Sequence, residues 1–287
     1  MPQTINTNLN SLNAQRNLSA SQTSLAMSMQ RLSSGLRVNS AKDDAAGLAI
    51  AERMTTQVRG MNVAIRNAND GISLSQTAEG AMGKVSDSLQ RMRELSVQAA
   101  NSTNSDTDKD SLDKEFGELS KEIQRVLGGT TFNGKHMLGT DASSFVFQVG
   151  ANTTANDTIA IDTVDLTADS TITAVAGTDN QGAGRATIAG TQSATQIQGV
   201  IDQIDTALNT VNSNRAVMGA SQSRFDAVIT NLQTSVENQT AAKSRIMDTD
   251  FAAETANLSR AQILQQAGNA MVAQANQLPN QVLTLLR

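Results

Sequence analysis

The sequence has 287 residues and a net charge of −5, so its bulk charge does not indicate a nucleic-acid-binding protein. It contains no Cys, Trp or Tyr and a single His, which excludes a disulfide framework, a thiolate nucleophile and a multi-histidine metal site. From this inventory we expect no catalytic, cofactor-binding or metal-binding residues. Because the chain has only 2 Pro and 19 Gly, few residues would interrupt a helix, and the composition favours long helices.

The first predicted helix ends at Gly35. A narrow apolar stripe at three- and four-residue steps includes Leu18, Leu25, Met29 and Leu32. Glycine favours the left-handed conformation that ends many helices, so the helix should end there. Residues 1–10 lack the basic and apolar segments of a cleavable secretory signal. We therefore expect a cytosolic protein or one exported without such a signal.

A second predicted helix begins among the polar residues 40–44, whose short side chains and two Asp suit a helix N-terminus. It continues to about residue 100, with a stripe that includes Met82, Leu89 and Met92. Residues 101–108 are predicted to form a polar loop. A third helix is predicted over 112–127, ended by the glycine pair 128–129.

The middle of the chain has a different character. Residues 132–135 carry a turn signal, and residues 145–149 are rich in strand-forming side chains. Residues 158–162 and 171–173 also have short β signatures. We therefore predict a small β-rich, Thr-rich surface segment at about 140–195.

The most regular pattern covers residues 197–246, where a four-three step continues without a break, as in a coiled-coil seam. After the capping residues 248–250, the last segment repeats the step. The sequence has no apolar run of the roughly 18 residues that a membrane-spanning helix needs, so we expect no membrane insertion.

These elements predict a mainly α fold, an elongated antiparallel helical bundle or coiled coil with a small β-hairpin region. We expect a terminal coiled-coil domain of residues 1–40 plus 247–287 and a long-helix rod domain of residues 41–246. A pair of terminal helices cannot bury its own apolar stripes, so self-assembly is expected. The residues predicted to form this polymerisation core are Leu18, Leu25, Met29, Leu32, Leu264, Met271, Leu278, Val282 and Leu285.

Three long segments resemble bacterial flagellin: residues 32–47 (LSSGLRVNSAKDDAAG), residues 90–101 (QRMRELSVQAAN) and residues 276–287 (NQLPNQVLTLLR). The shorter segments 131–134 (TFNG) and 147–152 (FQVGAN) add to this resemblance. It covers about residues 1–152 and 197–287. The chain looks like a short form with little beyond the inner and middle domains of the family.

The resemblance implies a non-enzymatic subunit that polymerises into the extracellular flagellar filament for motility and is exported unfolded by the flagellar type III system. The implied partners are other copies of the chain, hook–filament junction proteins, a filament cap protein, an export chaperone at the C-terminal segment, and the Toll-like receptor for flagellin. No nucleic acid is among them.

Receptor recognition is implied, by the same resemblance, for Arg91, Leu95 and Glu115. Arg91 and Leu95 lie about 100° around the helix from its core stripe, so they need not be core residues. An ordinary surface or subunit-contact role is the alternative. The tail residues Val282, Leu283, Leu285 and Leu286 match the segment that cytosolic immune sensors read in related flagellins, and a buried inner-filament helix is the simpler interpretation.

Two other functions compete with a filament subunit. A flagellin-like junction protein between hook and filament shares the terminal helices, and the full match over residues 90–101 argues against it. An unrelated coiled-coil signalling rod or adhesin would not need the matching tail. An enzyme has no support, because this inventory supplies no combination of nucleophile, base and orienting group.

Overall fold

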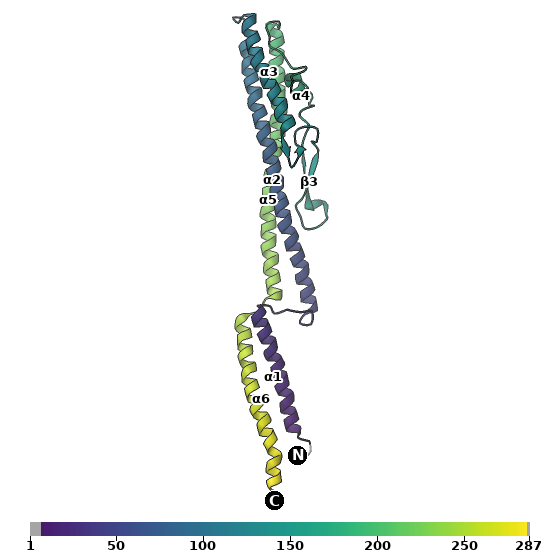
Figure 1. The fold of residues 1–287 in the computed structure, drawn as a ribbon, viewed down its shortest axis with the longest axis vertical. Helices are drawn as coiled ribbons and strands as arrows, with labels where there is room; N and C mark the ends of the chain where they lie inside the picture. The colour runs from purple at the N-terminus through teal and green to yellow at the C-terminus, as the bar shows by residue number, and fades with distance from the viewer. Residues whose placement is uncertain (1–6, 286–287) are drawn as a thin grey trace. The chain divides into compact units, whose positions relative to one another are not determined.

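The computed structural model describes residues 7–285, and side chains as far as Gln277. Five long helices dominate the described part: α1 (Leu9–Ser34), α2 (Ala45–Ala99), α3 (Asp106–Gly129), α5 (Ala194–Met247) and α6 (Phe251–Leu285) (Figure 1). The short elements are β1 (Thr131–Phe132), β2 (Lys135–His136), β3 (Ser144–Gln148), β4 (Thr158–Asp162), α4 (Ser170–Ala176) and a 3-10 turn at Ala155–Asp157. The predicted mainly α fold with a minor β part is confirmed.

The chain divides into two compact units. Met1–Val58 and Glu237–Arg287 make up the terminal unit, and Arg59–Val236 make up the central unit. Both boundaries fall inside long helices, α2 and α5. The sequence analysis instead predicted a terminal coiled-coil domain of residues 1–40 plus 247–287. That division stays a prediction.

In the terminal unit, α1 and α6 pack along each other. Asn8 caps α1, since its side chain accepts a hydrogen bond from the Ser11 N–H, and its amide also donates to the Ala275 carbonyl at 2.7 Å. Gly35, at φ 71°, ends α1 in the left-handed conformation, as predicted. The Arg37 N–H then donates to the Met247 carbonyl at 2.6 Å. This bond joins the α1–α2 connector to the end of α5.

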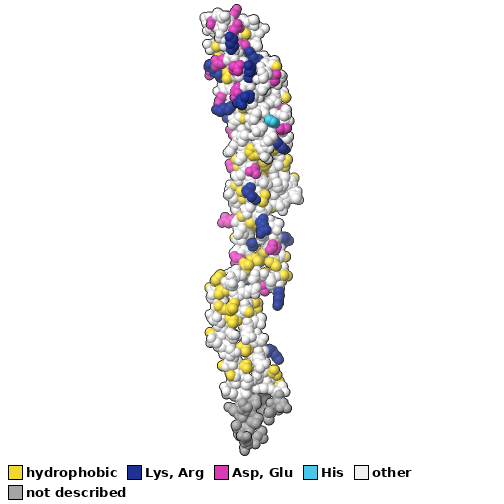
Figure 2. Space-filling view, in the orientation of Figure 1, with side chains coloured by type: hydrophobic (Ala, Val, Ile, Leu, Met, Phe, Trp, Pro, Cys, Tyr) yellow, Lys and Arg dark blue, Asp and Glu magenta, His cyan; other side chains and the backbone are white. Residues whose placement is uncertain are grey.

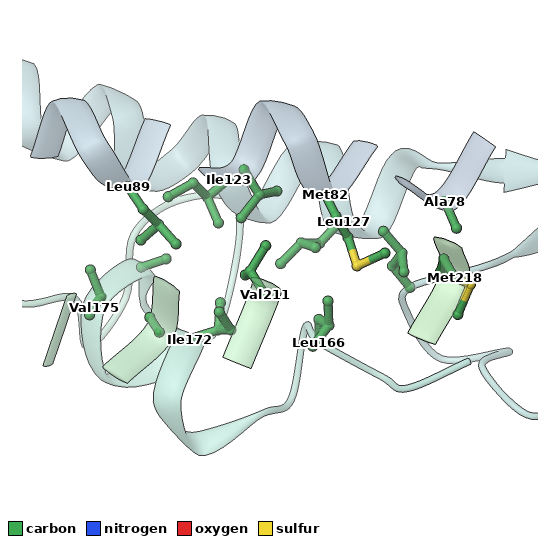
Figure 3. Packing of buried hydrophobic residues seen from close by; sticks show 14 of the residues in the cluster. Ala78, Met82, Leu89, Ile123, Leu127, Leu166, Ile172, Val175, Val211 and Met218 are labelled. Atoms are coloured by element: carbon green, nitrogen blue, oxygen red, sulfur yellow. The ribbon is translucent and has the colours of Figure 1, made fainter. Parts of the chain in front are cut away.

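The core of the central unit lies between α2, α3 and α5, with α4 and the β3–β4 hairpin covering it (Figures 1 and 3). The predicted stripe of α2 is buried there, including Met82, Leu89 and Met92. The α5 stripe supplies a second set of buried side chains: Ile197, Ile204, Val211, Met218 and Phe225. The three- and four-residue steps of both helices therefore predict which faces meet.

Helix α3 begins six residues earlier than predicted, so the expected polar loop is shorter. Ser105 is its N-cap and Asp108 the reciprocal partner: the Ser105 side chain accepts from the Asp108 N–H, and the Asp108 carboxylate accepts from the Ser105 N–H at 3.0 Å. This capping box satisfies two N–H groups that the first turn would otherwise leave unpaired. The helix also continues through both glycines to Gly129.

Two antiparallel hairpins form the β part. The turn predicted at 132–135 joins β1 to β2, with Asn133 at φ 50° and Gly134 at φ 79°. The two predicted strands pair as β3 and β4, with Phe147 opposite Ile159. The Phe147 ring then meets the Phe225 ring edge to face, with centroids 5.7 Å apart, which attaches this hairpin to α5.

The strand expected at residues 171–173 is wrong, because this segment is helix α4. Asp169 caps it by accepting a hydrogen bond from the Thr171 N–H at 2.8 Å. The side chains of Ile172 and Val175 are buried in the core beside α3. Capping and burial thus outweigh the β-branched preference of the sequence.

Residues 177–193, here called the strap, follow α4 and lie along α3. Arg185 holds the strap with two bonds from its guanidinium to the Asp113 carboxylate, at 2.6 and 3.0 Å. The guanidinium also lies over the Phe116 ring, 5.9 Å from its centroid. The Ile188 N–H donates to the same carboxylate at 2.8 Å. A side-chain pair 72 positions apart thus fixes a segment without regular secondary structure.

Candidate assembly and recognition surfaces

Helices α1 and α6 expose large apolar side chains, between 42% and 69% of each being accessible. We call this set the terminal apolar surface, and Figure 2 shows hydrophobic side chains of this region on the exterior. Its members are Leu9, Leu12, Met27, Met29, Phe251, Ile263, Leu264 and Met271. Soluble monomers rarely expose many such residues together, so a surface of this kind indicates a binding partner.

Two grooves run between α1 and α6 on this surface. One, of about 380 Å³, has Met27, Arg31 and Glu254 among its lining residues. The other, of about 550 Å³, is lined in part by Leu18 and Met271. Both grooves include the Leu264 side chain, so they adjoin each other.

Polar contacts join α1 and α6, which bury few apolar side chains between them. The Ser11 hydroxyl donates to the Asn276 side-chain oxygen at 2.8 Å. Arg31 lies 3.9 Å from the Glu254 carboxylate, whose side chain is nearly buried. Because the two helices are joined in this way, the remaining apolar faces stay free for other contacts.

The predicted polymerisation core falls into three groups in the structure. Met29, Leu264 and Met271 are exposed, so a neighbouring subunit could cover them. Leu18, Leu25 and Leu32 are half-buried. The backbone positions of Leu278, Val282 and Leu285 belong to α6, but their side chains lie outside the described residues.

Sequence reasoning missed five exposed members of the terminal apolar surface: Leu9, Leu12, Met27, Phe251 and Ile263. They lie beside the predicted stripes rather than on them, because one helix partner covers only part of each helix. Adjacent apolar residues such as Ile263 and Leu264 were the available signal, since a single helix contact cannot cover both.

Charge around the α1–α2 connector is organised by local hydrogen bonds. The Asp43 carboxylate accepts from the Ser40 hydroxyl and from the Ser40 N–H, each at 2.9 Å, and from the Asn39 N–H at 3.2 Å. These bonds, with the Ser40 hydroxyl first, hold the pKa of Asp43 below its ordinary value. The carboxylate thus stabilises the turn that leads into α2.

Two of the three residues predicted for receptor recognition form an ion pair. The Arg91 Nε donates to the Glu115 carboxylate at 2.8 Å, and a second guanidinium nitrogen donates to Glu94 at 2.9 Å. All three side chains are about half exposed or more. The hydrogen bond to Glu115, followed by that to Glu94, raises the pKa of Arg91.

The third residue, Leu95, is 1% exposed, so the expectation that it need not be a core residue is wrong. It belongs to the same buried cluster as Phe116 and Ile123 of α3. Leu95 lies one turn beyond Arg91, whose guanidinium binds Glu115 of α3, so this side of α2 faces α3.

The tail positions predicted for cytosolic sensing, Val282, Leu283 and Leu285, belong to α6 with side chains outside the described part, and Leu286 lies outside it altogether. Among the described residues, no group of three or more His, Cys, Asp and Glu is placed to hold a metal ion. No helix in that same part of the chain is long and apolar enough to cross a membrane.

Comparison with known proteins finds similarity over most of the sequence. Residues 5–142 match the family model of the bacterial flagellin N-terminal helical region, and residues 201–286 match that of the C-terminal helical region. The chain is 44% identical over 283 residues to a flagellin of Halalkalibacterium halodurans, covering 99% of each sequence. It is 42% identical over 302 residues to a flagellin of Bacillus subtilis, again covering 99% of each.

One solved structure is similar in fold alone. It is described as a candidate flagellar hook-associated protein from Vibrio parahaemolyticus, with 14% sequence identity and a TM-score of 0.59. The likeness covers 72% of this chain and 100% of that one.

Proposed function

The chain belongs to the bacterial flagellin family and is a structural, non-enzymatic subunit of the extracellular flagellar filament, and we propose that it polymerises through the terminal apolar surface. The observation that carries this proposal is the exposure of Met29, Leu264 and Met271 on α1 and α6. Fully burying one such side chain contributes about 1.5–3 kcal/mol, part of which association entropy offsets.

The charge distribution supports the same surface. Helix α1 has 26 residues and α6 has 35, yet their charged residues are Arg16, Arg31, Glu254 and Arg260. Depletion of charge is typical of the buried centre of protein interfaces. In Figure 2 the charged side chains gather instead toward the α3 end of the central unit.

Seeded growth tests this proposal. Monomer is added to short filament fragments, and elongation is followed by electron microscopy for the intact chain and for a chain lacking residues 1–40 and 250–287. We expect long filaments from the intact chain alone. An intact chain that folds, by circular dichroism, but does not grow on its own fragments would favour a junction protein instead.

A point variant sharpens the test. Leu264→Asn places a polar side chain on the terminal apolar surface, whereas Gln266→Asn places the same residue at an exposed polar position of α6. We expect slower elongation for the first variant and near-normal elongation for the second. Equal rates would contradict the assignment of Leu264.

Export and its partners are proposed from the family. We infer that the subunit leaves the cell unfolded through the flagellar type III system, with an export chaperone on the C-terminal segment. A filament cap protein and hook–filament junction proteins are its partners at the filament end. The absence of Cys supports this route, because no disulfide has to form outside the cell. Loss of secretion in cells without the export channel is the expected result.

Recognition of the monomer by an innate immune receptor is proposed on the Arg91–Glu115 pair, with Leu95 supporting it from the core. The matched control is Arg125, an exposed arginine on α3 that pairs with Glu122 at 2.6 Å. Arg91→Ala should reduce receptor activation by monomer, and Arg125→Ala should not. Equal activation by both variants would remove Arg91 from the recognition site.

The C-terminal residues Val282, Leu283, Leu285 and Leu286 are proposed, by resemblance alone, as the segment that cytosolic immune sensors read. A chain shortened after residue 281 should still activate the innate immune receptor that recognises the Arg91–Glu115 pair, and should lose the cytosolic response. Retention of the cytosolic response would refute this role.

A further inference from the structure

Methionine supplies nearly all of the easily oxidised groups in this chain. The sequence has 11 Met and no Cys, Trp or Tyr. Two-electron oxidants such as peroxides convert the methionine thioether to a sulfoxide, which is polar and is reversed by methionine sulfoxide reductases. The response of the subunit to such oxidants therefore depends on which thioethers are accessible.

Burial separates the described methionines into three sets. Those of the central unit are 0% to 6% exposed: Met61, Met82, Met92, Met137 and Met218. Three in the terminal unit are open: Met27 is 42% exposed, Met29 is 54% exposed and Met271 is 62% exposed. Met54 and Met247 are of intermediate exposure. An oxidant in solution should thus reach the three open thioethers first.

The open thioethers belong to the terminal apolar surface. Met27 lines the groove that contains Arg31, and Met271 lines the adjoining groove beside Leu18. Met29 lies on α1, two residues from Met27 and therefore on another side of that helix, outside both grooves. In that second groove, the close approach of α1 depends on Gly268, where a Cβ would lie 3.1 Å from the Leu18 Cδ1.

We propose that Met27, Met29 and Met271 are modification sites whose oxidation by a peroxide stops an unassembled subunit from joining the filament. The proposal rests on polymerisation through the terminal apolar surface. The sulfur lone pair attacks one peroxide oxygen, so an S–O bond forms and the O–O bond breaks. Sulfur is oxidised by two electrons, and the other oxygen leaves with both protons as water.

The sulfoxide opposes assembly because its oxygen is a hydrogen-bond acceptor that water satisfies in the free subunit. Covering it with a neighbouring subunit removes that water, and each sulfoxide left without a partner should weaken binding of the subunit to the filament end by about tenfold. Thioethers already covered in a filament are out of reach of the oxidant. Free subunits are therefore sensitive to peroxide, and assembled ones are resistant.

The test compares three full-length chains. One is unsubstituted; one carries Met27→Leu, Met29→Leu and Met271→Leu; and the control carries Met82→Leu, Met92→Leu and Met218→Leu. Leucine and methionine have similar volumes, so both triple variants should fold, which circular dichroism checks. Each monomer is treated with hydrogen peroxide, mapped by peptide mass spectrometry, and added to untreated filament fragments.

We expect sulfoxide first at the three open sites. The oxidised unsubstituted chain and core control should then need at least about a tenfold higher monomer concentration to elongate. The variant without the three open methionines should elongate at the same rate after treatment as before it. Treating the oxidised unsubstituted chain with methionine sulfoxide reductases should restore its growth, since the chain has no thiol that the reductant could affect.

Two results would overturn the proposal alone: normal elongation of the oxidised unsubstituted chain, or equal loss of elongation by the variant that lacks the open methionines. Oxidation of core and open sites at equal rates would overturn it as well, whether or not the core control folds. If untreated monomer does not elongate at all, the proposed polymerisation fails, and this inference fails with it.

Discussion

Replacing Gly71 with alanine should destabilise the central unit, although alanine is the better helix former. A Cβ at residue 71 would lie 2.7 Å from the Cζ of Phe225 and 3.0 Å from its Cε2. Phe225 is fully buried and packed edge to face against Phe147, so its ring has little room to move. Overpacking costs about 1–3 kcal/mol, and the helix preference returns about 0.5–1 kcal/mol. We expect a net loss of about 1–2 kcal/mol.

Two other glycines of α2 provide controls of opposite sign. A Cβ at Gly80 or Gly83 would meet no atom within 4 Å, so alanine there should stabilise the monomer by about 0.5–1 kcal/mol. Thermal unfolding of monomer, followed by far-UV circular dichroism, measures the difference. In a unit of this size 1 kcal/mol changes Tm by about 2–4 °C, so Gly71→Ala should lower Tm by about 2–8 °C.

The double variant Gly71→Ala with Phe225→Leu tests the stated cause. It should be less destabilised than the sum of the two single variants, because the smaller side chain relieves the clash. The reasoning would be refuted if Gly71→Ala melted at or above the temperature of the Gly80→Ala control.

Three further predictions concern α2, α3 and the strap. Ser105→Ala removes the N-cap of α3 and should cost about 1 kcal/mol, seen as faster hydrogen exchange in its first turn; unchanged exchange would contradict this. Burial raises the pKa of Asp113, but hydrogen bonds from Arg185 and a strap N–H, with the Arg185 charge, outweigh it and lower that pKa below the ordinary 3.8. A lowered carboxyl pKa stabilises the fold above the ordinary value and ceases to do so as pH falls below it, so strap amides should exchange faster at about pH 3 than at about pH 5, after correction for intrinsic rates. Asp113→Asn should abolish that pH difference, and its persistence would implicate other groups. Leu95→Ala should cost about 2–5 kcal/mol in thermal unfolding, and Arg91→Ala should cost much less, because an exposed ion pair contributes little; equal losses would contradict the burial of Leu95.

The long helices could be predicted because their burial pattern repeats along the sequence. Met82, Leu89 and Met92 follow the helical period, and each is buried where the stripe predicts. The C-terminal end of α1 and the start of α6 could also be predicted, since Gly35 and the capping residues 248–250 signal them directly. Periodicity and capping act between neighbours in the chain, so one sequence suffices to recognise them.

Features that depend on a third packing partner were not predicted. Leu95 lies off the α2 stripe and is buried in the cluster that includes α3 side chains, which the period of α2 alone does not reveal. Residues 171–173 have strand-like side chains but form α4, because Asp169 caps them and Ile172 is buried in the core beside α3. The start of α3 was a missed local signal, since the Ser105–Asp108 spacing already indicates a capping box.

The candidate site shows the same limit. The resemblance predicted Arg91 and Glu115, and the structure joins them at 2.8 Å. The Arg185–Asp113 pair, in contrast, has no local pattern, because its members are 72 positions apart. The full extent of the terminal apolar surface also required coordinates, because exposure depends on how α1 and α6 cover each other.

Hydrogen–deuterium exchange of monomer and filament tests most directly whether α1 and α6 form the assembly interface. The peptides that contain Met29, Leu264 and Met271 report on the terminal apolar surface in both states. If neighbouring subunits cover this surface, amides of α1 and α6 should exchange at least about tenfold more slowly in the filament. Unchanged exchange in α1 and α6, with protection confined to the central unit, would contradict the proposal that the terminal helices hold the filament together.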